Sequence, residues 1–166
     1  MTGGTTMELS RTVVGFGPTD LEDYWEMLTW KTTENIDFNF IDCGLYDDPQ
    51  NDNEQYVKEK VREVMKATDR YALLISEDTK FKCKYIRWEA QVAIEKGCTI
   101  IGINLDGIRE IDEEICPAVL HNIGATFVAF SPQIVAYAIE HFKMKDKGNW
   151  NYDDDLYEEL GYADNE

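Results

Sequence analysis

Glu89 is the residue whose position in the sequence most directly suggests chemistry. It lies in the stretch Tyr85–Lys96, where the spacing of apolar residues predicts an amphipathic helix. Val92 and Ala93 follow it by three and four positions, so the carboxylate is expected on or near the side that faces a sheet. Burial without a partner raises the pKa of a carboxyl group, which is costly unless the group is paired or used. Glu89 is therefore a candidate catalytic residue, and the structural alternatives are an ion pair with Arg87 or Lys84, or capping of the helix's own amide groups.

Other polar residues are weaker candidates. Asp42 follows a predicted strand and is a candidate hydrogen-bond partner for a ribose, with a turn cap as the alternative. Ser76 ends another strand. His121 and His141 are isolated in the sequence, which favours structural roles. The aspartates of residues 47–52 lack the spacing of a calcium-binding loop, so no metal site is predicted.

Five apolar segments predict the strands that position these residues. They alternate with amphipathic segments of helical spacing, which indicates βαβ units and a parallel sheet. We expect an α/β fold, a flavodoxin-like three-layer sandwich with a five-stranded parallel sheet in the order 2-1-3-4-5. The expected strands are Thr12–Phe16, Phe38–Ile41, Tyr71–Ile75, Thr99–Leu105 and Thr126–Phe130.

The carboxyl ends of these strands form the predicted binding edge. In such sheets a ligand binds outside the strand ends, beside the switch point between strands 1 and 3. The segments that reach this edge are residues 16–20, 42–53, 76–84 and 104–107. The helix after the first strand is expected to face the sheet with Leu21, Tyr24, Trp25 and Leu28.

The chain is expected to form one main domain, residues 11–142. Residues 1–10 are mostly small and polar, which is typical of a flexible tail. Residues 143–166 form an acidic C-terminal extension, in which a short helix around Asp155 to Leu160 is possible. No internal repeat or linker suggests a second domain.

Charge and composition exclude several classes of protein. The 33 acidic residues outnumber the 16 basic ones and give a net charge of −17, which argues against nucleic-acid binding. No apolar run approaches the ~20 residues of a membrane span. The four cysteines lack zinc-site spacing and are expected to be reduced thiols of a cytoplasmic protein.

A resemblance to a known family rests mainly on residues 71–104. There an apolar strand ends in a small polar loop, followed by an aromatic residue, an Arg-Trp-Glu triplet at residues 87–89 and another apolar strand. Trp30-Lys31 before residues 36–40, and Cys116-Pro117 before the last expected strand, agree with the same pattern. Over most of residues 11–142 the chain resembles the bacterial TIR-like domain family, which includes the ThsB-type proteins of Thoeris anti-phage defence.

The resemblance implies that the chain cleaves NAD at the nicotinamide glycosidic bond. Glu89 matches the catalytic helix glutamate of the family, and some members cyclise the product into a signalling nucleotide. One carboxylate suffices, because nicotinamide leaves as a neutral group and the remaining transition state has oxocarbenium character. NAD is then a substrate, with no tightly bound cofactor. The residues expected to contact it are Phe16, Gly17, Asp20, Asp42, Ser76, Thr79 and Trp88.

The expected partners follow from the same resemblance. They are NAD, other copies of the chain in a homo-oligomer or TIR–TIR assembly, and an effector protein that receives the signal. Two alternatives remain open: an inactive TIR-like interaction module, and a nucleoside deoxyribosyltransferase-like enzyme. A receiver domain is disfavoured because strand 3 ends in Ser76 rather than Asp, and a flavodoxin because residues 17–20 lack a phosphate cradle rich in Ser and Thr.

Overall fold

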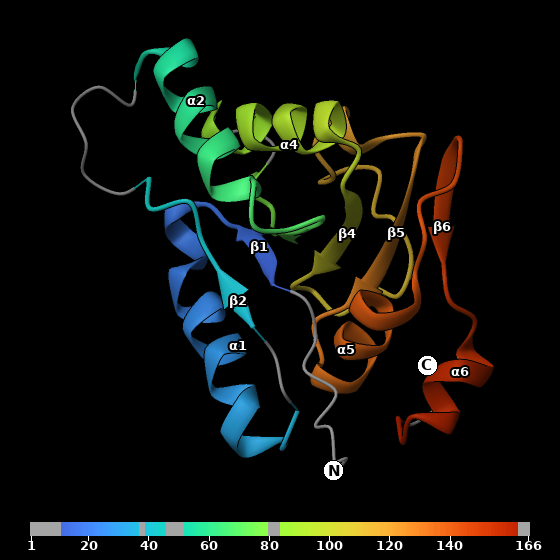
Figure 1. The fold of residues 1–166 in the computed structure, drawn as a ribbon. Helices are drawn as coiled ribbons and strands as arrows, with labels where there is room; N and C mark the ends of the chain where they lie inside the picture. Colours follow the sequence, from blue (N-terminus) through green and yellow to red (C-terminus); the bar gives the residue numbers. More distant parts are fainter. Residues whose placement is uncertain (1–10, 37–38, 46–51, 80–83, 163–166) are drawn as a thin grey trace, which may run out of the picture.

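A six-stranded parallel sheet forms the centre of the protein (Figure 1). The structure is a computed structural model, and it describes residues 11–36, 39–45, 52–79 and 84–162. The strand order is β2-β1-β3-β4-β5-β6, and every neighbouring pair is parallel. The strands are β1 Thr12–Gly15, β2 Phe40–Ile41, β3 Arg70–Ile75, β4 Thr99–Asn104, β5 Ile123–Ala129 and β6 Gly148–Asn151. The flavodoxin-like α/β fold is confirmed, whereas the prediction of five strands is wrong by one.

Helices cover both faces of this sheet, which gives the three expected layers. Figure 1 shows α1 and α5 on one side and α2 and α4 on the other. The residues buried between these layers form two separate apolar clusters, one on each face of the sheet. The helices are α1 Leu21–Thr33, α2 Glu54–Met65, α4 Lys84–Lys96, α5 Pro132–His141 and the short α6 Asp154–Glu159, with 3₁₀ turns η1 Pro18–Asp20 and η3 Ala118–Leu120. None of the helices in the described ranges is both long enough and apolar enough to cross a membrane.

Strand β3 shows why the sequence folds in this way. Its residues 71–75 have no exposed surface, because helices cover both faces of a central parallel strand. Successive side chains point to opposite faces, so Tyr71 and Leu73 pack in the cluster toward α2 and α4. Ala72 and Leu74 pack in the cluster toward α1 and α5. β3 therefore contributes side chains to both apolar clusters, one on each face of the sheet.

The sixth strand comes from the C-terminal extension. β6 has few apolar residues, and instead side-chain amides anchor its start. The backbone N–H of Asn122 donates to Asn149 Oδ1, and the backbone N–H of Gly148 donates to Asn122 Oδ1. The predicted short helix is α6, and its Tyr157 hydroxyl accepts a hydrogen bond from the backbone N–H of Ala129 at 3.1 Å. Hydrophobic periodicity does not report such amide contacts, which is why β6 was missed.

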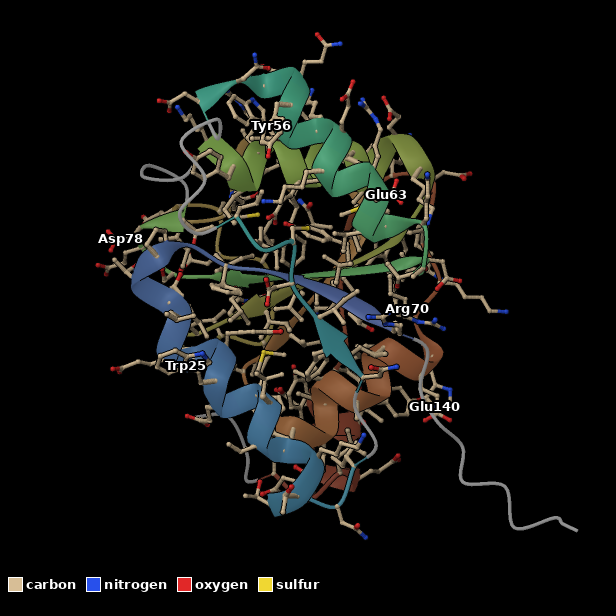
Figure 2. The ribbon with its side chains drawn as sticks, turned by 60° about the vertical axis from the view of Figure 1, so that its left-hand side comes forward. Trp25, Tyr56, Glu63, Arg70, Asp78 and Glu140 are labelled. Carbon is tan, nitrogen blue, oxygen red and sulfur yellow. The ribbon has the colours of Figure 1, made fainter. Side chains whose placement is uncertain are left out.

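The buried face of α1 differs from the predicted one. Tyr24, Met27 and Trp30 are buried at intervals of three residues. Trp25 and Leu28, which were expected to face the sheet, are 56% and 44% exposed. Figure 2 places Trp25 on the side of α1 away from the sheet. The apolar residues of this helix surround too much of its circumference for spacing alone to select the buried face.

Three cysteines in the described part of the chain are buried and outside any disulfide bond: Cys43, Cys98 and Cys116. Cys83 lies outside the described residues, as do the aspartates at positions 47 and 48. Asp52 is described, and it forms an exposed ion pair with Lys84 at 2.5 Å.

Candidate active site

Helix α4 carries Glu89 on the side that faces the sheet, as its spacing predicts. Only 6% of the residue is exposed. The Tyr71 hydroxyl of β3 donates a hydrogen bond to Glu89 Oε1 at 2.9 Å, and the Cys43 thiol also lies within hydrogen-bonding reach of the carboxyl group. Among the residues that the structure describes, no basic side chain forms an ion pair with Glu89. The alternative of an ion pair with Arg87 or Lys84 is therefore wrong, and Lys84 pairs with Asp52 instead.

Burial dominates the acid–base properties of Glu89. It raises the pKa of Glu89 to about 8, and the negative charge of Asp42 acts in the same direction. The hydrogen bonds from Tyr71 and Cys43 favour the ionised form and lower the pKa, but they do not offset the burial. A carboxyl group with a pKa in this range is mostly protonated at pH 7 and becomes mostly charged only above about pH 8, so a reaction that needs the charged form speeds up as the pH rises.

Gly15, at the end of β1, provides the space that this carboxyl occupies. A Cβ atom at position 15 would lie 2.6 Å from Glu89 Oε1 and also overlap the Tyr71 hydroxyl. Any side chain here would displace both groups. Glycine inside a strand commonly marks such a close approach.

Gly15→Ala is expected to destabilise the protein by about 1–3 kcal/mol, because a buried neighbour has to move to admit the methyl group. Gly17→Ala is the matched control. A Cβ atom at position 17 would meet only Asp20 Oδ2, at 3.8 Å, and the φ angle of −81° suits alanine. Urea denaturation of both variants measures the difference, and equal free energies of unfolding would contradict the close packing of Glu89 against β1.

A second carboxyl group lies near the end of β1. Asp20 is 4% exposed, and its Oδ2 accepts a hydrogen bond from the Ser76 hydroxyl at 2.9 Å and a longer one from Thr79 at 3.5 Å. Burial raises the pKa of Asp20, and these hydroxyl groups partly counteract it. The Asp20 backbone N–H donates to the carbonyl of Gly17. Four predicted site residues therefore meet in one cluster that joins the ends of β1 and β3.

The Glu89 and Asp20 clusters approach the same short piece of chain. Glu89 lies against Gly15 and Asp20 against Gly17, two residues further on. Two residues of extended chain span ~7 Å. Asp42 is close enough for its charge to act on Glu89, while its own Oδ1 accepts a hydrogen bond from the Gly44 N–H at 2.7 Å, the turn cap that was the alternative role.

The two aromatic residues predicted to contact NAD lie apart from each other. Phe16 stacks on Tyr24 of α1 with ring centroids 4.6 Å apart, on the face of the sheet opposite α4. Trp88 is 5% exposed and packs in the core beside Tyr85. Neither ring presents a broad free surface next to Glu89.

Three neighbours of Glu89 were missed from the sequence: Gly15, Cys43 and Tyr71. Two of the three carried a weak signal. Among the fully buried residues 71–75 of β3, Tyr71 alone has a polar group in its side chain, and a buried tyrosine hydroxyl usually has a partner. Gly15 interrupts a strand. These signals indicate that something polar lies close by but do not identify it.

Glu89 does not line either of two surface hollows of about 570 Å³ found in the described structure. One lies beside the edge strand β2 and includes Asp42, Tyr24 and Leu28. The other lies at the far end of the sheet between residues 106–110 and residues 151–154.

A comparison with protein families decides the classification. The family model described as Thoeris protein ThsB, TIR-like domain, matches residues 15–110, which are 96 of the 166 residues. The chain belongs to this family. The ThsB TIR-like match includes the Glu89 cluster, the Asp20 cluster and Gly15, and it ends before β5. The family match and the flavodoxin-like fold thus both agree with a TIR-like defence module. No curated protein matched the chain.

Proposed function

We propose that this ThsB-family chain cleaves NAD at the bond between nicotinamide and ribose. The observation that carries the proposal is the buried Glu89 carboxyl, which faces the end of β1 without an ion-pair partner among the described residues. When it is ionised, a group held in this way provides a single anion in a region of low polarity, where its effect on a nearby positive charge is strongest. Family membership supports a role for the reaction in anti-phage defence.

The chemistry needs only that anion and a nucleophile. The C1′–N bond of the ribose breaks, and its electron pair neutralises the positive pyridinium ring, so nicotinamide departs without being protonated. Positive charge develops on the ribose as the bond lengthens, in the manner of other glycoside cleavages. The ionised Glu89 stabilises this charge. Water then attacks C1′ and loses a proton to give ADP-ribose, or a nitrogen of the adenine attacks to give a cyclic product.

The polar groups around Glu89 suit the remainder of the substrate. The Asp20, Ser76 and Thr79 cluster supplies hydrogen-bond acceptors and donors for ribose hydroxyls. Gly17 leaves backbone free of a side chain just after β1, where a sugar can approach closely. In this proposal Asp42 contacts a ribose or shapes the field at Glu89, while Phe16 and Trp88 contribute apolar surface.

We further propose that the product is a cyclic ADP-ribose-type signal in the cytoplasm. A defence module that makes a diffusible nucleotide requires a second protein that binds it, which is the effector partner expected from the Thoeris family. Because Glu89 is only 6% exposed, the site has to open before NAD reaches the carboxyl group. In this proposal, self-association of the chain is what opens it.

The test is direct measurement of nicotinamide. Purified protein is incubated with NAD at low and high protein concentration, and also with lysate from phage-infected cells, and products are separated by chromatography. We expect nicotinamide and ADP-ribose or its cyclic isomer in at least one condition. Release of free base from deoxynucleosides would instead indicate the transferase.

One observation favours a second candidate function, a TIR-like interaction module without activity. Glu89 is enclosed by Tyr71, Cys43 and Gly15, and it opens onto neither hollow. A structural carboxyl would have the same surroundings. The absence of nicotinamide release in all three conditions above would favour this module over the enzyme.

A further inference from the structure

Tyr71 has a contact that packing alone does not explain. It is fully buried in the central strand β3, and its hydroxyl lies 2.9 Å from Glu89 Oε1. A phenylalanine would fill the same space without bringing a polar group into the core. The ring also lies directly beneath Gly15, since a Cβ atom there would come within 2.9 Å of Tyr71 Cζ. The hydroxyl is thus fixed by its surroundings and directed at one oxygen of Glu89.

We propose that Tyr71 is a positioning residue for NAD cleavage, whose hydroxyl fixes the Glu89 carboxyl group and favours its charged form. This inference rests on the proposed function. A phenol that donates to a carboxylate stabilises the charged state, since a charge-assisted hydrogen bond is stronger than a neutral one. Tyr71 belongs to β3 and has no exposed surface, so in this proposal it acts on the substrate only through Glu89.

The other groups that face Glu89 act on it in different directions. Cys43, which follows β2, contributes a weaker hydrogen bond from a thiol that burial keeps protonated. Asp42 opposes ionisation through its charge. Lys60 of α2, on the same face of the sheet as α4 (Figure 1), donates from its Nζ to the Gly44 carbonyl at 3.1 Å. Among the described groups, Tyr71 is therefore the strongest donor to Glu89.

The experiment measures the ionisation of Glu89 directly. Protein with ¹³C-labelled glutamate carboxyls is titrated by NMR, and the Glu89 signal is identified by its loss in Glu89→Gln. In Tyr71→Phe the Glu89 pKa is expected to rise by about one unit, which means about a tenfold smaller charged fraction at pH 7. Cys43→Ala gives a smaller rise and serves as a second variant if Tyr71→Phe folds poorly. Tyr137→Phe, a tyrosine of α5 across the sheet, is the matched control.

Activity provides the second readout. Nicotinamide release by Tyr71→Phe is expected to fall about tenfold at pH 7 and to recover at higher pH, whereas a purely structural loss would not recover. An unchanged Glu89 pKa in Tyr71→Phe would overturn the inference, whatever happens to activity. If the pKa rises but wild-type protein never releases nicotinamide, the proposed function fails, and the control of Glu89 by Tyr71 stands.

Discussion

Glu89→Gln is expected to lower kcat for nicotinamide release by about 10²–10³-fold, the range seen when one preorganised group that stabilises transition-state charge is removed. Gln keeps the size of the side chain and can still accept the hydrogen bond from Tyr71. The substitution therefore removes the negative charge while leaving the surrounding contacts in place. The loss should fall mainly on kcat, because the anion interacts most strongly with the charge that develops as nicotinamide leaves.

Glu95→Gln is the matched control for this variant. Glu95 lies on the same helix, but its side chain is 62% exposed and pairs with Arg62 on the surface at 3.0 Å. Its substitution removes one charge from α4 without touching the site, so nicotinamide release should stay within about twofold of wild type. Equal losses in both variants would indicate a general effect of charge on α4 and contradict a specific role for Glu89.

Glu89→Gln is also expected to stabilise the folded protein, relative to wild type, at high pH. The ordinary pKa of Glu89 is 4.5, and burial raises it to about 8 in the folded chain. Between these values the folded state keeps a proton that the unfolded state has released, so the contribution of Glu89 to stability falls as pH rises. The loss is complete above the folded pKa, where it reaches about 3–5 kcal/mol. Gln carries no charge and does not suffer this loss.

The measurement is the free energy of unfolding of wild type and Glu89→Gln from pH 4 to pH 9 by urea denaturation. The difference between the two proteins removes the contribution of other titrating groups. The free energy of unfolding of Glu89→Gln is expected to exceed that of wild type by an amount that increases from about pH 4.5 and levels off above about pH 8. A difference that does not vary with pH would mean that Glu89 is solvated in the folded state.

The central part of the fold was predictable because burial leaves a clear pattern in the sequence. β3 and β4 are central strands covered on both faces, so their sequences are almost continuously apolar. β6 lies at an edge and is held by side-chain amides, and it has no such pattern. On α1 the exposed Trp25 resembles a core residue by type alone.

The candidate site was predictable to a smaller extent. The inward direction of Glu89 follows from helical spacing, because residues three and four positions later are buried. Its contact with Tyr71 depends on the register between α4 and β3, which no local pattern specifies. The cluster of Asp20 with Ser76 and Thr79 likewise joins loops 56 to 59 residues apart in the sequence. Neighbours of this kind appear only when the chain is folded.

The pH dependence of kcat/KM for NAD tests the central claim most directly, because it reports the ionisation of groups in the free protein. Nicotinamide release is followed from pH 5.5 to pH 9.5 under the condition that gives the highest activity. If the ionised Glu89 carboxylate carries the reaction, kcat/KM rises about tenfold per pH unit and levels off near pH 8. A profile that is flat across this range, or that is unchanged in Glu89→Gln, would contradict the account.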